Sequence, residues 1–79
     1  MEPRKILLVE DEEGIINIEK AYLEKAGFQV EKAMDGNEAL EQYTAFAPDL
    51  VVLDLMLPKK SGEEVLQSIK EQKDTPVII

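Results

Sequence analysis

Residues 5–11 read Lys-Ile-Leu-Leu-Val-Glu-Asp, and residues 50–54 read Leu-Val-Val-Leu-Asp. Each stretch is a short apolar run without polar alternation, which is typical of a strand buried on both faces of a parallel sheet. Each run is followed directly by acidic residues, namely Glu10 and Asp11 after the first and Asp54 after the second. Carboxylates at the end of a buried strand are poorly solvated and repel one another. A divalent cation, or a proton on one acid, would relieve that repulsion. The two stretches therefore predict a sheet and a site built from Glu10, Asp11 and Asp54.

The rest of the chain alternates between helical and strand periods. The expected strands cover residues 5–9, 28–33, 50–53 and 77–79. Helices are expected over 12–26, between Asp35 and Pro48, and after Ser61, the last two beginning with capping boxes formed with Glu38 and Glu64. The order βαβαβαβ with short connections predicts an α/β fold, namely a doubly wound parallel sheet with right-handed crossovers and helices on both faces.

Apolar residues at helical spacing define the expected core. In the first helix these are Ile15, Ile18, Tyr22 and Leu23, and the aromatic residues expected in the core are Tyr22, Phe28, Tyr43 and Phe46. Met34 and Met56 are interpreted as packing or loop residues.

Composition limits the classes of function. A chain of 79 residues forms at most one small domain. It has no cysteine and no histidine, which excludes disulfides and thiolate or imidazole metal ligands, so any catalysis depends on carboxylates. The net charge of −8 argues against nucleic-acid binding by this segment. No apolar run is long enough for a membrane span or a signal peptide, and we expect a cytoplasmic protein.

The predicted site lies where such sheets bind ligands, beyond the carboxyl ends of the strands at the point where strand order reverses. If strands 5–9 and 50–53 pair directly, the three acids converge within a few ångströms. Simpler roles are also open: Asp54 could cap the following turn, and the acids at 10–11 could stabilise the start of the next helix. Asp35 is interpreted as a turn and helix cap.

Four motifs occur in register along the chain: Val9-Glu10-Asp11, Asp35-Gly36 before Glu38-Ala39-Leu40, Asp54-Leu55-Met56-Leu57-Pro58, and Gly62. Together they resemble the receiver domain of two-component response regulators, and the similarity covers essentially all 79 residues. The segment 54–58 is especially similar to regulators that carry a winged-helix DNA-binding output domain. The resemblance therefore implies signal transduction and transcription regulation.

The resemblance implies that Asp54 is the phosphoacceptor, which takes a phosphoryl group from a histidine kinase or phosphotransfer protein. It also implies that Glu10, Asp11, Asp54 and the Met56 carbonyl bind Mg²⁺, an ion that prefers oxygen ligands. Glu10 stands where many members have Asp, so its contact with the ion can run through water. We expect a phosphoacceptor that phosphorylates itself rather than a turnover enzyme.

The family continues beyond the fourth strand with a Thr or Ser, a helix, a fifth strand ending in Lys, and a final helix. These segments are not among the 79 residues. We therefore expect residues 1–79 to be the N-terminal two-thirds of a receiver domain, with no second domain and with impaired phosphorylation. The expected strand order is 2-1-3-4. Lys59 could replace the missing Lys in part, although a solvated loop lysine is the simpler interpretation. The fourth strand would be an unprotected edge, so we expect self-association, strand exchange or a larger parent chain.

Two other functions are considered. A truncated or engineered receiver fragment could serve as a structural, self-associating unit without signalling output. A hydrolase of the haloacid-dehalogenase type also uses an Asp nucleophile at a strand end, but it needs a second Asp two residues later, where Met56 stands.

Overall fold

The computed structural model describes residues 4–54, 61–72 and 75–79. Its elements, in chain order, are β1 (Lys5–Val9), α1 (Glu13–Lys25), β2 (Gln29–Ala33), α2 (Gly36–Phe46), β3 (Leu50–Leu53), α3 (Gly62–Gln72) and β4 (Val77–Ile78). All strand pairs are parallel and the strand order is β2-β1-β3-β4. The α/β class, the element order and the strand order predicted from the sequence are confirmed.

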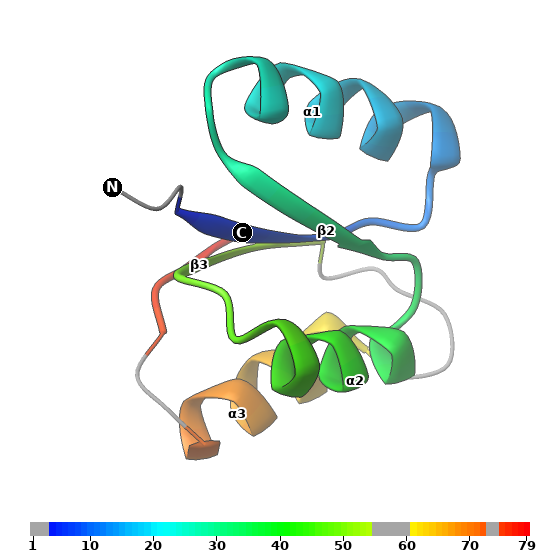
Figure 1. Cartoon of the computed structure of the whole chain (residues 1–79). Coiled ribbons are helices and arrows are strands. Elements are labelled where there is room, and N and C mark those ends of the chain that lie inside the picture. Colours follow the sequence, from blue (N-terminus) through cyan, green and yellow to red (C-terminus); the bar gives the residue numbers. More distant parts are fainter. Residues whose placement is uncertain (1–3, 55–60, 73–74) are drawn as a thin grey trace.

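The sheet lies between α1 on one face and α2 with α3 on the other (Figure 1). Successive residues of a strand point to opposite faces, so β1 contributes to two cores. The core beneath α1 contains Ile6, Leu8, Ile16 and Val30. The larger core on the other face contains Leu7, Val9, Ala33, Ala39, Tyr43, Val51, Leu53, Val65 and Ile69. The unbroken apolar run at residues 6–9 thus supplies buried side chains to both faces of β1.

The predicted apolar face of α1 is wrong. Ile15, Ile18 and Tyr22 are 49%, 60% and 73% exposed, whereas Ile16 is fully buried. Leu23 does pack against the core beneath α1, as predicted. Two apolar stripes lie side by side on this helix, and the helical spacing that reveals the helix does not say which stripe contacts the sheet.

The four aromatic residues predicted to lie in the core differ in their burial. Tyr43 is buried as predicted, and its hydroxyl lies 2.7 Å from the hydroxyl oxygen of Thr75. Phe28 and Phe46 are partly buried. Tyr22 is exposed, so the prediction that it lies in the core is wrong.

Both predicted helix caps are present; the capping box at α3 is reciprocal, whereas at α2 the Glu38 side chain accepts from the residue before the cap. The Glu38 N–H donates to Asp35 Oδ1 at 2.8 Å, and the Met34 N–H donates to Glu38 Oε1 at 2.9 Å. At α3 the Glu64 N–H donates to Ser61 Oγ at 3.2 Å, while the Ser61 N–H donates to Glu64 Oε1 at 3.3 Å. These bonds satisfy backbone donors of the first turns, and they confirm the interpretation of Asp35 as a helix cap.

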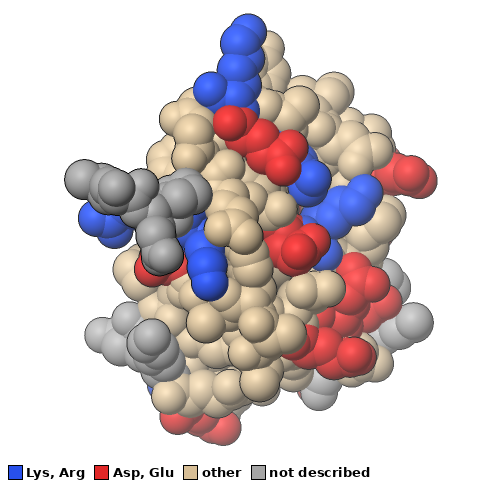
Figure 2. All heavy atoms as spheres, viewed as in Figure 1, with Lys and Arg blue, Asp and Glu red and all other residues tan. Residues whose placement is uncertain are grey.

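The surface carries many charged groups. Figure 2 shows acidic and basic side chains interspersed over one face, with uncharged surface between them. Within the described ranges, no helix has the length and hydropathy needed to span a membrane.

Candidate metal site

Two of the acids are fixed by the sheet itself. Glu10 follows β1, and its N–H donates to the Ala33 carbonyl of β2 at 3.1 Å. Asp54 follows β3, and its N–H donates to the Val9 carbonyl at 2.9 Å. Val9 is the register partner of Leu53, so the two acids leave paired strands at the same level. The hydrogen-bond ladder thus continues one residue beyond each strand and holds both backbones in place.

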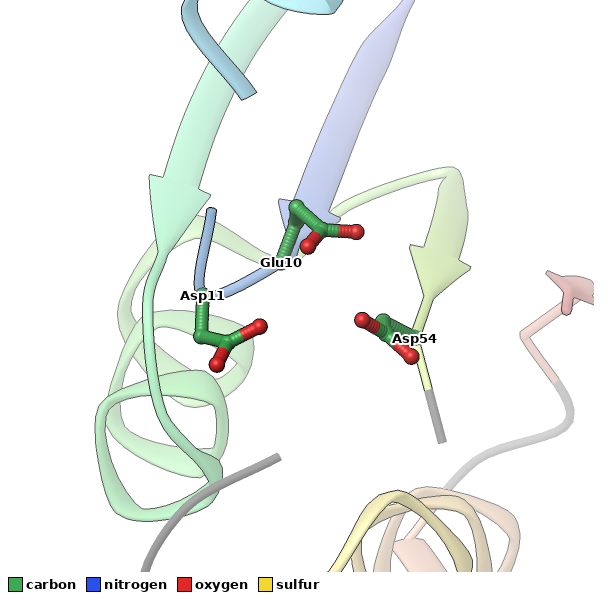
Figure 3. A group of neighbouring side chains, drawn as sticks. All are labelled: Glu10, Asp11 and Asp54. Atoms are coloured by element: carbon green, nitrogen blue, oxygen red, sulfur yellow. The ribbon is translucent and has the colours of Figure 1, made fainter. Parts of the chain in front are cut away.

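The three carboxylates converge as predicted. One oxygen from each of Glu10, Asp11 and Asp54 lies within 4.8 Å of the other two. Figure 3 shows the three side chains directed toward a common space at the ends of β1 and β3. Oxygen ligands of Mg²⁺ lie about 2.0–2.1 Å from the ion, so they are roughly 3–4 Å apart around it. Small side-chain movements would bring this cluster into that range, and the donor set is the one that Mg²⁺ prefers.

The electrostatics of the cluster centre on Glu10, which is partly buried. Burial raises the pKa of Glu10 above its ordinary value, while the Glu12 N–H, which donates to Glu10 Oε1 at 3.1 Å, acts in the opposite direction. The charges of Asp54 and Asp11 and a hydrogen bond with Asp54 raise this pKa further. Without a metal, the site thus favours the uncharged form of Glu10 more than water does, and a divalent cation beside this acid would favour its charged form.

Glu10 also has the structural role that the sequence left open. The Glu12 N–H that it accepts lies just before the first turn of α1, so this acid helps to satisfy the backbone there. The two roles are compatible because a carboxylate has a second oxygen for the cluster.

A hollow of about 380 Å³ adjoins the acids on the α1 side of the sheet; its lining residues are Leu8, Val9, Glu10, Glu19, Val52, Leu53, Asp54 and Ile79. Sequence reasoning missed Glu19, a half-buried acid of α1. Glu19 lies three residues after Ile16, beside the buried stripe of the helix, and the sequence alone does not show that this stripe is the buried one. Met56, Pro58 and Lys59 lie outside the described residues.

We expect Glu10→Gln to stabilise the metal-free chain. Since the folded-state pKa is raised, the folded chain binds this proton more tightly than the unfolded chain, and stability falls as pH rises from the ordinary 4.5 through the raised value. At neutral pH in EDTA the variant should melt a few degrees higher than the parent chain, because the uncharged amide removes a partly buried charge that Asp54 and Asp11 repel.

The same variant should gain less stability from added Mg²⁺ than the parent chain does. Glu41→Gln is the matched control, since Glu41 is an exposed acid on α2 outside the cluster. Thermal unfolding followed by circular dichroism measures both effects. An unchanged response of the Glu10 variant to Mg²⁺ would contradict a role for this acid in metal binding.

A family model and curated proteins of similar sequence indicate the same family for this chain. Residues 6–79 match the model of the response regulator receiver domain. The chain is 47% identical over 70 residues to the alkaline phosphatase synthesis transcriptional regulatory protein PhoP of Bacillus subtilis (strain 168), covering 89% of this chain and 29% of PhoP. It thus spans about a third of the length of the curated relatives that it matches.

Solved structures show the same architecture. The chemotaxis protein CheY4 of Vibrio cholerae superposes with a TM-score of 0.90 at 32% identity, over 95% of this chain and 65% of CheY4. The response regulator TrrA of Thermotoga maritima, solved in complex with Mg²⁺-BeF, gives a TM-score of 0.84 at 37% identity, over 89% of this chain and 61% of TrrA.

Proposed function

Because the chain belongs to the receiver-domain family of two-component response regulators, we propose that it accepts a phosphoryl group on Asp54. A histidine kinase or a phosphotransfer protein is the proposed donor. The observation that carries this proposal is the convergence of three carboxylates within 4.8 Å beyond adjacent central strands. Phosphoryl transfer depends mainly on positioning and charge neutralisation, and such a cluster is suited to both.

In the proposed reaction a carboxylate oxygen of Asp54 attacks the phosphorus of a phosphohistidine. The P–N bond breaks, its electron pair stays on the imidazole nitrogen, and the new O–P bond makes an acyl phosphate. The hydrogen bond from the Asp54 N–H to the Val9 carbonyl fixes the backbone of the nucleophile, so little reorganisation is needed for in-line attack.

We propose that Glu10, Asp11 and Asp54 hold Mg²⁺, with the Met56 carbonyl as a further ligand. When bound, the ion supplies positive charge that offsets the nucleophile and the phosphoryl oxygens. One oxygen of Glu10 already accepts the Glu12 N–H, and the side chain is longer than the Asp of many relatives. These two features favour a water-mediated contact for Glu10 if the ion is bound.

Beryllofluoride tests this proposal, since it binds a carboxylate oxygen as a phosphoryl mimic and TrrA was solved with Mg²⁺-BeF. In ¹⁹F NMR of the chain with Mg²⁺ and beryllofluoride, we expect resonances of bound beryllofluoride that disappear with EDTA and in Asp54→Asn. Bound resonances that persist in Asp54→Asn, or their absence from a folded, Mg²⁺-loaded chain, would contradict the proposal.

The setting of this module is also a proposal. PhoP is by name a transcriptional regulatory protein, and the chain corresponds to 29% of it. We propose that the chain acts in the cytoplasm as the regulated part of a transcriptional regulator, with nucleic-acid binding left to other segments. The net charge of −8 supports that division because a DNA backbone repels an acidic surface.

A second candidate function, as a self-associating unit, is favoured by a different observation. The exposed side chains of Ile15, Ile18 and Tyr22 form an apolar flank of α1. Ile78 of β4 and Ile79, which follows it, are also more than half exposed. Apolar side chains exposed side by side, as on this flank of α1, are a feature of interaction surfaces in folded proteins. This feature is separate from the acid cluster, so the two functions can be tested independently.

A further inference from the structure

β2 forms one edge of the sheet. It pairs with β1 in a parallel register that joins Val30 to Ile6 and Lys32 to Leu8, and no other described strand pairs with it. β4 lies at the opposite edge of the sheet. An unpaired strand edge is a template for a further strand, so folded proteins restrict what such an edge can bind.

Two residues of β2 offer backbone groups on the open side. The Gln29 N–H donates to the Arg4 carbonyl at 2.9 Å, so the backbone groups of Gln29 point toward β1. Because these groups alternate between the two sides of a strand, those of Glu31 also point toward β1. Val30 and Lys32 therefore direct their N–H and C=O groups outward.

The outward N–H groups at the two ends of β2 are already used. The Phe28 N–H, just before the strand, donates to the Leu23 carbonyl of α1 at 3.1 Å. The Met34 N–H, just after it, donates to Glu38 Oε1 at 2.9 Å. A further strand can therefore form a complete set of hydrogen bonds only with the two outward residues inside β2.

A second copy of the chain would pair with this edge antiparallel, because a two-fold axis reverses the direction of the strand. The register that uses all the outward groups places Val30 of each copy opposite Lys32 of the other, and each such pair exchanges two hydrogen bonds. Glu31 then lies on the axis, opposite Glu31 of the second copy. The Cα atoms of such a non-hydrogen-bonded pair are about 4.5 Å apart, and their side chains lie on the same face.

The neighbouring symmetric registers form fewer bonds. With Val30 opposite itself, Lys32 lies opposite Phe28, whose N–H is already used. With Lys32 opposite itself, Val30 lies opposite Met34, whose N–H is also used. Each shift retains one complete pair, and the second also brings two lysines together. The best-bonded register is thus the one in which two copies of Glu31 meet.

No neighbouring cation of β2 offsets this pair of acids. Val30 and Lys32 point to the α1 side of the sheet, where Val30 enters the core and Lys32 Nζ donates to Asn17 Oδ1 at 3.0 Å. Glu31, which is half-buried, points to the opposite face, and within the described ranges it forms no ion pair. Its charge is therefore the one that a strand added to this edge would meet.

We propose that Glu31 closes the β2 edge to a second copy of the chain and selects instead an extended strand that places a lysine or arginine opposite it. Like charges directly opposite each other on antiparallel strands are destabilising, whereas opposite charges stabilise the pair. Because the edge offers only two outward residues, this central pair decides between partners. The inference does not depend on the acid cluster or on the proposed function.

Amide hydrogen exchange at Val30 and Lys32 tests the proposal, since their N–H groups would be the donors of the pairing. The ¹⁵N-labelled parent chain is mixed at millimolar concentration with an excess of unlabelled parent, Glu31→Lys or Glu41→Lys. We expect exchange of these two amides to slow only with Glu31→Lys, which should bind about fivefold or more tightly than the parent does. Glu41→Lys is the matched control, because Glu41 is an exposed acid of α2 and the two variants have the same net charge.

Circular dichroism verifies that both variants fold, which is expected because Glu31 is only half-buried and lysine is common on edge strands. Equal slowing with the parent and with Glu31→Lys would overturn the proposal, since Glu31 would then not exclude a second copy. Slowing with neither variant, or equally with both, would overturn it as well, because the charge opposite Glu31 would not select the partner. Association through another surface leaves these two amides unprotected, and beryllofluoride binding tests Asp54 separately.

Discussion

We expect the replacement of Asp54 by Asn to abolish the uptake of a phosphoryl group from acetyl phosphate or phosphoramidate. An amide oxygen is a poor nucleophile toward phosphorus, and the change also removes one of the three carboxylates that would hold Mg²⁺. The expected loss is complete rather than partial, because the Asp54 oxygen is itself the atom that would form the bond to phosphorus. Radiolabelled donor in the presence of Mg²⁺, with the protein-bound label counted, measures the effect.

Asp35→Asn is the matched control for this experiment. Asp35 lies at the start of α2, where its side chain accepts the Glu38 N–H, and Asn caps helices about as well as Asp. The same Asp-to-Asn change should therefore leave both the fold and the uptake of label intact. Label that persists in folded Asp54→Asn would show that another carboxylate is the acceptor.

Leu7→Ala should remove a large part of the stability of the chain. Leu7 is 0% exposed at the centre of β1 and belongs to the larger core. Truncating a buried Leu costs about 2–5 kcal/mol through lost transfer energy and the cavity left behind. Small domains have a free energy of unfolding of only about 5–15 kcal/mol. Urea unfolding followed by circular dichroism gives the difference in free energy between the variant and the parent.

Leu40→Ala makes the same chemical change at a partly buried position. Leu40 lies on α2 and packs against the same core from its margin, so its truncation leaves a smaller cavity. The expected order is a clearly greater loss for Leu7 than for Leu40. Equal losses at both positions would mean that the sheet is not the centre of the packed structure.

The sheet and the acid cluster could be predicted from the sequence because both depend on local signals. Residues 6–9 and 50–53 are unbroken apolar runs, and each is followed directly by acid. Parallel strands that pair in register carry their next residues to the same edge, so placing the strands also placed Glu10, Asp11 and Asp54. The helix caps at Asp35 and Ser61 could also be predicted, because a capping motif involves only four consecutive residues.

The orientation of α1 could not be predicted in this way. Its apolar residues form two neighbouring stripes, one with Ile16 and Leu23 and the other with Ile15, Ile18 and Tyr22. Helical periodicity is the same for both, and the choice between them depends on how the helix packs against a sheet formed from distant residues. Glu19 was missed for the same reason, because its place beside the acid cluster follows from that orientation.

The most direct test of the central claim is to locate the phosphoryl group. Borohydride reduces an aspartyl phosphate to homoserine, which tandem mass spectrometry identifies at a single residue after treatment with acetyl phosphate. We predict homoserine at position 54, formed with Mg²⁺ and absent with EDTA. A reduced side chain at Asp11 or Glu10, or no reduced residue in a chain that is folded and binds Mg²⁺, would contradict the assignment of Asp54 as the phosphoacceptor.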